Sequence, residues 1–185
     1  MVMTQPTHAL IVPALHSGVD DHWYPDLRKR LAAQGFTDVR TSAPPSGEPE
    51  LADWLASVDE VGDGLGENSV VFGHSLGAVA ALAYLSARTD LSRIGRFIGV
   101  AGFAVPLPRL PTTKAFVEAV DAGRIRTLVA DRQVLLAEDD YAVAPELTEQ
   151  AAADIDATVH RFTRAGHFLA QDGWDRAGLI ADLAG

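Results

Sequence analysis

The chain has 185 residues, of which 48% are hydrophobic, a length and composition that fit one globular domain spanning residues 1–185 with a substantial core. Its formal net charge of −10 argues against nucleic acid or an anionic membrane as the main partner, because a field of that sign repels both. The chain lacks cysteine, which excludes disulfides, a thiolate nucleophile and cysteine-based metal sites.

The first residues do not resemble a targeting segment. Residues 1–7 carry no positive side chain, and the apolar run 10–12 is far too short for a signal peptide. No run of the sequence approaches the length of a membrane span. We therefore expect a soluble cytoplasmic protein, whose oligomeric state the sequence leaves open.

Short apolar runs alternate with longer amphipathic ones, which is typical of an α/β fold with a mostly parallel central sheet and helices on both faces. In chain order the sequence predicts a strand at 8–12, a helix at 23–34, a strand at 39–41, a loop at 42–49, a helix at 50–61, a strand at 69–72, a helix at 76–87 and a strand at 97–101. After a connection at 102–124 with one short helix near 114–122, it predicts a strand at 134–137, a helix at 145–154, a strand at 158–162 and a helix at 174–183.

The connection 102–124 contains three prolines and is too short to form a large cap domain. Its apolar side chains are expected to line one wall of a small, partly open pocket, with Phe168 and the loop at 15–16 on the other wall. These apolar side chains are Phe103, Val105, Leu107, Leu110 and Phe116. A pocket of this kind favours short ligands, because a long aliphatic chain needs a tunnel to bury its methylenes.

The most informative stretch is Val-Val-Phe-Gly-His-Ser-Leu-Gly at residues 70–77. An apolar, β-branched run enters a G-x-S-x-G pattern at 73–77, and a helical segment follows directly. This arrangement predicts a sharp strand-to-helix turn that presents the Ser75 hydroxyl at the end of a sheet. A side chain at Gly73 or Gly77 would crowd the turn or the adjoining strand and helix.

A serine hydroxyl is a poor nucleophile unless an adjacent base activates it, usually a histidine that a carboxylate orients. In α/β hydrolases the three residues follow in the order serine, acid, histidine. Here the acidic run 138–140 and His167 each follow a predicted strand, downstream of Ser75. Asp139 and Asp140 both remain candidates for the acid on this reasoning.

Four segments carry a family resemblance across nearly the whole length. They are Ile11-Val12-Pro13 with Asp21-His22-Trp23-Tyr24, then Gly73-His74-Ser75-Leu76-Gly77, then Asp139-Asp140-Tyr141-Ala142-Val143, and finally Gly166-His167-Phe168. In these segments the chain resembles the small serine hydrolases of the YdeN-like, retinoblastoma-binding-protein-type family within the α/β-hydrolase superfamily. The resemblance implies a single-domain α/β-hydrolase fold without a large cap domain.

Aligning Asp140 with the family's Asp-x-x-Val pattern implies that Asp140 is the catalytic carboxylate and that Asp139 shapes the turn. Two positions depart from the family. Tyr141 stands where the family usually has a proline, and the first strand leads through Pro13 into Ala14 rather than into a glycine.

Acyl transfer also needs two preorganised N–H donors where negative charge develops. One is expected from the backbone of Leu76, which follows the nucleophile at the start of a helix. The other is expected from the loop after the first strand, with Leu15 as first choice and Ala14 or His16 as alternatives.

Three further residues, His16, His22 and Phe168, are expected to contact the substrate, while His74 is expected to pack beneath the turn. Histidine and acidic spacings predict no metal site, and the chemistry requires no cofactor. The sequence therefore predicts a serine hydrolase that cleaves small carboxylic esters, or amides, through an acyl-enzyme on Ser75. The alternatives are a binding or scaffold protein on a hydrolase fold, and an acyltransferase or perhydrolase that uses the same three residues.

Overall fold

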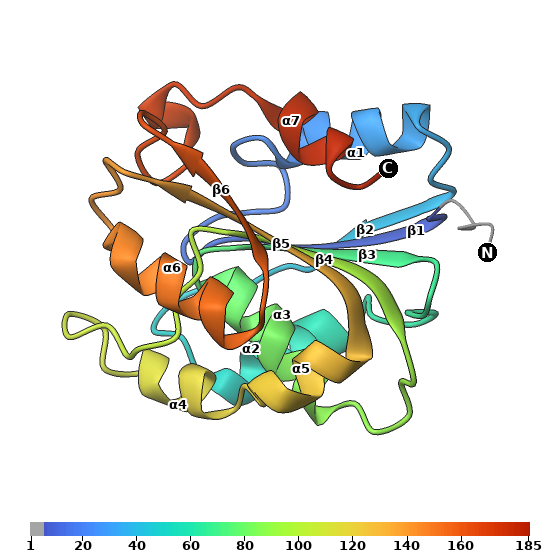
Figure 1. Cartoon of the computed structure of the whole chain (residues 1–185), viewed down its shortest axis with the longest axis horizontal. Helices are drawn as coiled ribbons and strands as arrows, with labels where there is room; N and C mark the ends of the chain where they lie inside the picture. Colours follow the sequence, from blue (N-terminus) through green and yellow to red (C-terminus); the bar gives the residue numbers. More distant parts are fainter. Residues whose placement is uncertain (1–5) are drawn as a thin grey trace.

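The computed structural model describes residues 6–185, and its centre is a six-stranded sheet in the order β2-β1-β3-β4-β5-β6 (Figure 1). The strands are β1 (His8–Val12), β2 (Asp38–Thr41), β3 (Ser69–His74), β4 (Ile94–Val100), β5 (Val129–Ala137) and β6 (Thr158–Phe162). Every neighbouring pair is parallel, so the sheet predicted as mostly parallel is wholly parallel. The expectation about a targeting segment rests largely on residues 1–5, which lie outside the described residues.

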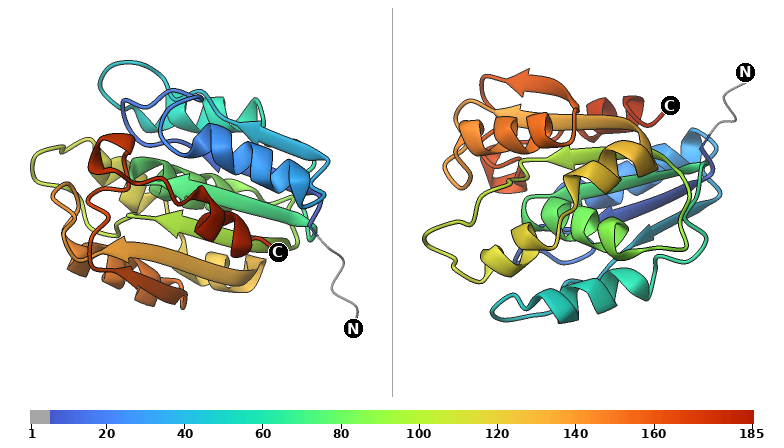
Figure 2. Two further views of the ribbon diagram at one scale, coloured as in Figure 1. Left: turned by 90° about the horizontal axis from the view of Figure 1, so that it is seen from above. Right: turned by 60° about the horizontal axis from the view of Figure 1, so that its bottom comes forward.

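Helices cover both faces of this sheet. They are α1 (Tyr24–Ala33), α2 (Leu51–Asp59), α3 (Leu76–Ala87), α4 (Thr113–Glu118), α5 (Ala122–Leu128), α6 (Pro145–Asp154) and α7 (Ala177–Asp182), with a short 3-10 helix η1 (Ala170–Asp172). Helices α1 and α7 pack side by side on one face, and α2 to α6 cover the other (Figures 1 and 2). The helices on both faces agree with the sequence prediction.

Each face has its own hydrophobic core, because successive strand side chains point to opposite sides of the sheet. In β1, Leu10 and Val12 join the core beneath α2 to α6, while Ala9 and Ile11 join the core beneath α1 and α7. Helix α3 is buried at every residue from Leu76 to Leu85, so its Ala- and Leu-rich sequence packs all round.

The largest differences from the sequence prediction lie between residues 102 and 137. Two helices, α4 and α5, occur where one short helix was expected, and β5 starts at Val129 instead of residue 134. Residues 131–133 of β5 are polar, and β6 pairs with β5 only from Gln133 onward. There Asp131 lies opposite Arg96 of β4, and the two side chains form an ion pair of 2.6 Å. Charged residues therefore stand near the start of β5 where an apolar run would mark a strand, so the sequence prediction begins the strand only at residue 134.

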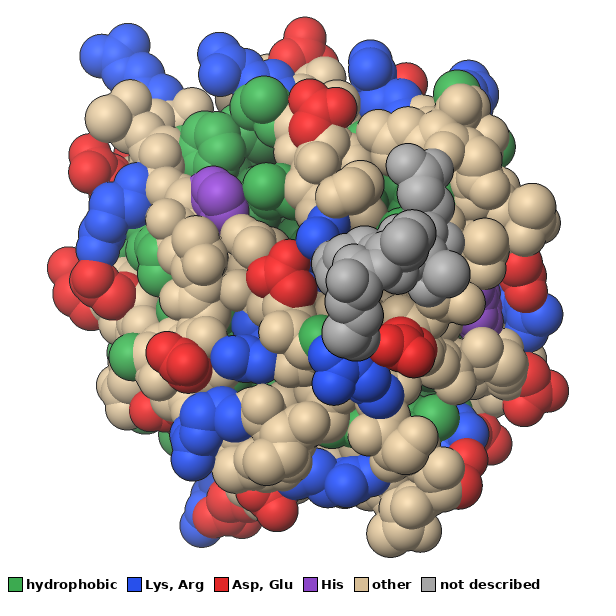
Figure 3. Space-filling model, turned by 45° about the vertical axis from the view of Figure 1, so that its right-hand side comes forward, with side chains coloured by type: hydrophobic (Ala, Val, Ile, Leu, Met, Phe, Trp, Pro, Cys, Tyr) green, Lys and Arg blue, Asp and Glu red, His purple; other side chains and the backbone are tan. Residues whose placement is uncertain are grey.

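Charged side chains of both signs are interspersed over the face drawn in Figure 3, without a broad area of one sign. The many acidic side chains are often paired, as in the ion pairs of Arg30 with Asp26 and of Arg88 with Asp90. No helix within residues 6–185 is both long enough and apolar enough to cross a bilayer.

The sharp turn between β3 and α3 depends on glycines at close contacts. A Cβ on Gly77 would overlap the carbonyl oxygens of Val12 and Pro13, and a Cβ on Gly73 would overlap the Cα of Ala78. The overlaps are with main-chain atoms, which cannot turn aside as a flexible side chain can. The glycines therefore allow the tight strand-to-helix turn that the sequence predicts, and they let α3 begin directly against the end of β1.

We expect Gly77→Ala to destabilise the fold by about 1–3 kcal/mol or more, because the added methyl forces α3 away from β1. Urea unfolding followed by circular dichroism measures this change. Gly66→Ala is the matched control, since a Cβ there meets no atom within 4 Å. Equal unfolding midpoints for the two variants would contradict the close-packing argument.

Candidate active site

Ser75 occupies the turn between β3 and α3 with φ 56° and ψ −122°. This conformation is sparsely populated for a side-chain-bearing residue and persists only where the surroundings enforce it. The Ser75 N–H donates to the Val100 carbonyl at 2.7 Å, which fixes the turn to β4. The hydroxyl is thereby held at the carboxyl edge of the sheet, where ligand sites of open parallel sheets form.

Three side chains from distant parts of the chain form one hydrogen-bonded line. Ser75 Oγ lies 2.8 Å from His167 Nε2, and His167 Nδ1 lies 2.8 and 3.0 Å from the two Asp140 carboxylate oxygens. An ionised carboxylate only accepts hydrogen bonds, so Nδ1 carries the ring hydrogen and Nε2 keeps a lone pair for the hydroxyl. The side chains of His167 and Asp140 are 8% and 2% exposed, which shields this line from water.

The two competing aspartates have different contacts. Asp140 Oδ1, besides its bond to the His167 ring, accepts the N–H groups of residues 142 and 143 at 2.8 and 2.9 Å. Asp139 Oδ1 instead accepts the N–H groups of residues 165 and 166 at 3.0 and 2.9 Å, and these bonds lower the pKa of its carboxyl. Asp140 therefore contacts the imidazole, while Asp139 holds the backbone of the loop just before it.

A third carboxylate, Asp172, was missed by sequence reasoning. Its Oδ2 accepts the His167 N–H at 2.9 Å and the Leu169 N–H at 3.1 Å, and its Oδ1 accepts the Tyr141 hydroxyl at 3.1 Å. Gly166, with φ +53°, leaves the room that Asp172 occupies, since a Cβ would lie 2.6 Å from the Asp172 Cγ. An aspartate five positions after a histidine has no motif of its own, so only the structure reveals it.

His74, expected to pack beneath the turn, lies fully buried there. Its Nε2 is 2.8 Å from the His167 carbonyl oxygen and its Nδ1 is 2.8 Å from the Tyr24 hydroxyl. Since a carbonyl only accepts, Nε2 donates to it and Nδ1 accepts from Tyr24. Burial, with His167 nearby, lowers the pKa of His74 to about 3, and burial raises the pKa of Tyr24. Both groups stay neutral and brace the backbone of His167.

His22 takes part in a second polar contact at the edge of the site. Its Nδ1 accepts the Ala170 N–H at 3.2 Å, so its Nε2 donates to Ser17 Oγ at 3.0 Å. Burial lowers the pKa of His22, which favours this neutral form. The bond between His22 and Ala170 ties the loop after β1 to the segment after β6, and the bond to Ser17 holds the His22 ring in place.

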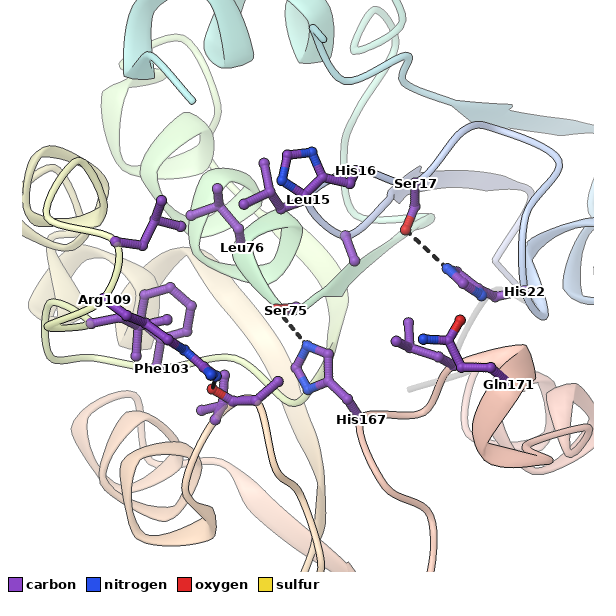
Figure 4. A pocket seen from close by; sticks show the side chains of 16 residues that line it. Leu15, His16, Ser17, His22, Ser75, Leu76, Phe103, Arg109, His167 and Gln171 are labelled. Carbon is purple, nitrogen blue, oxygen red and sulfur yellow. Dashed lines mark hydrogen bonds between the residues drawn. The ribbon is translucent and has the colours of Figure 1, made fainter. Parts of the chain in front are cut away.

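A cavity of about 410 Å³ opens over Ser75 (Figure 4). Expected contact residues His16 and His22 line it, together with Leu15 and Leu76. The other lining residues are Ala14, Ser17, Ser75, Phe103, Leu107, Arg109, Leu110, Ala142, Val143, His167, Leu169 and Gln171. Within residues 6–185 no group of three histidines or acidic residues is placed to hold a metal ion.

Phe168 does not line this cavity, so its expected contact with substrate is wrong. The residue has φ 57° and is fully buried, with its ring centroid 5.8 Å from that of Phe162 and 4.8 Å from that of Trp174. Leu169 takes the cavity-facing position in its place. Val105 and Phe116 also fall outside the cavity lining, and Phe116 packs edge-on against Trp54.

The contacts of the candidate N–H donors show which of them are free to bind an oxyanion. Leu76 is the first residue of α3, where N–H groups have no partner inside the helix, and it faces the cavity. The Ala14 N–H donates to the Tyr24 hydroxyl at 3.0 Å and is therefore occupied. Leu15, the first choice from sequence, and His16 remain for the second donor.

Comparison with known proteins gives matches over nearly the whole chain. A family model described as "Serine hydrolase" matches residues 9–183. The YdeN protein of Bacillus subtilis (strain 168) is 30% identical over 174 residues, which cover 94% of this chain and 92% of YdeN. The crystal structure of the B. subtilis ydeN gene product superimposes with a TM-score of 0.88, covering 97% of this chain and 96% of the other.

More distant structures share the fold alone. The mouse alpha/beta hydrolase domain-containing protein 10 has a TM-score of 0.66 at 13% identity, covering 99% of this chain and 91% of the other. The esterase domain of a Rhodothermus marinus protein has a TM-score of 0.67 at 17% identity, covering 99% and 88%. These matches confirm the predicted α/β-hydrolase fold.

We expect Asp140→Asn to lower the turnover of p-nitrophenyl butyrate by about 10³–10⁴-fold, because an amide no longer selects the correct imidazole tautomer. Asp139→Asn, the matched control, should lose less than about tenfold, since a side-chain amide oxygen can still accept the backbone N–H groups. Steady-state kinetics on folded variants, checked by circular dichroism, measure both. Equal losses would contradict the separate placement of the two carboxylates.

Proposed function

Because this chain belongs to the serine hydrolase family, we propose that it cleaves small carboxylic esters through an acyl-enzyme on Ser75. The observation that carries the proposal is the hydrogen-bonded line from Ser75 through His167 to Asp140 at an open cavity. The proposed partner is a small-molecule ester, and the proposed location is the cytoplasm.

In the first half of the proposed reaction, Ser75 Oγ attacks the ester carbonyl carbon while its proton passes to His167 Nε2. Asp140 stabilises the imidazolium that forms, through its bond to Nδ1. The negative oxygen of the tetrahedral intermediate accepts hydrogen bonds from the Leu76 and Leu15 N–H groups. His167 then gives its proton to the leaving alkoxide oxygen, and the acyl group stays on Ser75.

In the second half, water enters the site and attacks the acyl-enzyme. His167 Nε2 takes a proton from this water and returns it to Ser75 Oγ as the carboxylic acid leaves. Every proton transfer uses the same nitrogen, so the fixed orientation of the His167 ring serves both halves. No cofactor takes part in this scheme.

The hydrogen-bonded line also bears on the alternatives. A binding or scaffold protein needs no aligned serine, histidine and aspartate, so the arrangement favours catalysis. An acyltransferase or perhydrolase would use the same line with another acceptor. The cavity that Ser75 lines is partly open, which supports water as the acceptor.

We expect a fluorophosphonate probe to label the wild-type protein on Ser75 and to leave Ser75→Ala unlabelled. Ser75→Ala and His167→Ala should each lower ester turnover by several orders of magnitude, because the two residues act as one unit. The double variant should lose little more than either single one. Near wild-type hydrolysis by Ser75→Ala would refute the proposed function.

The apolar wall of the cavity bears on the length of the acyl chain. Phe103 lines the main cavity, and it also lines two smaller apolar cavities of about 20 and 80 Å³. These lie towards Leu82 and Ile155, beneath α3 and α6. Phe103 therefore bounds the space over Ser75 on the side where these smaller cavities lie, which supports a preference for short acyl chains.

We expect p-nitrophenyl esters from acetyl to butyryl to be cleaved faster than palmitoyl esters. Phe103→Ala should move the optimum to longer chains, since each newly buried methylene contributes about 0.8 kcal/mol, or about fourfold. Phe36→Ala is the control, because Phe36 lies in the core beneath α1 and α7, outside all three cavities, and its loss should leave the optimum in place. A wild-type maximum at twelve carbons or longer would contradict the short-chain preference.

A further inference from the structure

The catalytic cavity differs in charge from the protein around it. The chain has 25 acidic residues, yet no aspartate or glutamate among the described residues 6–185 lines the cavity. The one lining side chain with a permanent charge is Arg109, from the loop between β4 and α4. An acidic protein thus presents a cationic group, and no carboxylate, to whatever enters this cavity.

The lining has two unlike halves on either side of Ser75 (Figure 4). One half is polar and contains Ser17, His22 and Gln171. The other half is apolar around Leu76 and Phe103. Arg109 belongs to the apolar half, so a ligand group that reaches it passes along apolar side chains.

The Arg109 guanidinium is held in place but keeps free donors. Its Nη2 donates to the Ala142 carbonyl oxygen and, at 3.4 Å, to the Tyr141 carbonyl oxygen. Both contacts use one nitrogen, and within residues 6–185 no hydrogen bond of Nε or Nη1 is formed. A guanidinium has five N–H donors in a planar fork that matches a carboxylate, so the exposed Arg109 keeps donors free for an anion.

We propose that the acyl part of the substrate ends in a carboxylate that Arg109 binds, so that the substrates are monoesters of short dicarboxylic acids. This inference rests on the proposed esterase function. A few methylenes of the acyl chain lie along the apolar half, and the alcohol lies on the side of His167 and His22. Hydrolysis adds the oxygen of water to the acyl carbon and leaves the alcohol and the dicarboxylate as products.

The test compares two esters with equal numbers of acyl carbons, monoethyl glutarate and the neutral ethyl valerate. The readout is the ratio of their kcat/KM values, followed through released ethanol, in which general losses of activity cancel. We expect the wild-type protein to favour the anionic ester by about tenfold or more, as a charge-assisted hydrogen bond allows. Arg109→Gln should remove this preference, Arg109→Lys should keep part of it, and added salt should weaken it.

Arg93→Gln is the matched control. It removes one positive charge beside Glu67, before the amino end of β4, and should leave the ratio unchanged. An unchanged ratio in Arg109→Gln, with only a lower melting temperature, would overturn the proposal and make Arg109 a support for its loop.

Two further outcomes separate the proposals. If the wild-type protein cleaves ethyl valerate in a Ser75-dependent way but shows no preference for the anionic ester, this inference fails and the esterase function stands. If it cleaves neither ester, the esterase function fails as well. A stronger preference for carboxymethyl butyrate over ethyl butyrate would place the anion on the alcohol and overturn the acyl assignment.

Discussion

The hydrogen bond between His167 and Ser75 depends on how firmly the loop after β6 holds the imidazole. This loop has no regular hydrogen-bonding ladder, so polar side chains from elsewhere satisfy its backbone. Asp139 accepts the N–H groups of residues 165 and 166, and Asp172 accepts the N–H of His167. His74 donates to the carbonyl oxygen of His167. The peptide units on both sides of His167 are thereby fixed before Asp140 orients its ring.

The parallel sheet brings these groups together. Residues after the carboxyl ends of β1, β3, β5 and β6 supply the proposed oxyanion donor Leu15, the proposed nucleophile Ser75, Asp139 with Asp140, and His167, respectively. Parallel strands end at the same edge, so residues about 90 positions apart, such as Ser75 and His167, come within hydrogen-bonding distance. The charged and strained groups then rest on two apolar cores that do not depend on them.

The sequence predicts those parts of the site that depend on local geometry. The glycines around Ser75 signal a tight turn because only a short-range contact is at issue, whereas the choice of Asp140 over Asp139 comes from the family resemblance. The predicted contact of Phe168 with the substrate is wrong, because the left-handed backbone at Phe168 turns its ring into the core beside Trp174. Tyr24 acts through the distant His74, which no spacing within one segment encodes, and Asp172 binds nearby N–H groups of a loop that has no sequence motif.

The neutral state of His74 has a thermodynamic consequence for the whole fold. In the unfolded chain this histidine takes up a proton near its ordinary pKa of 6.5, while burial in the folded protein lowers the pKa to about 3. Between these values the unfolded state binds more protons than the folded state. The free energy of unfolding therefore decreases, and the fold becomes less stable, as the pH falls from 6.5 towards 3. The same histidine that braces the His167 backbone therefore couples the integrity of the fold to mild acid.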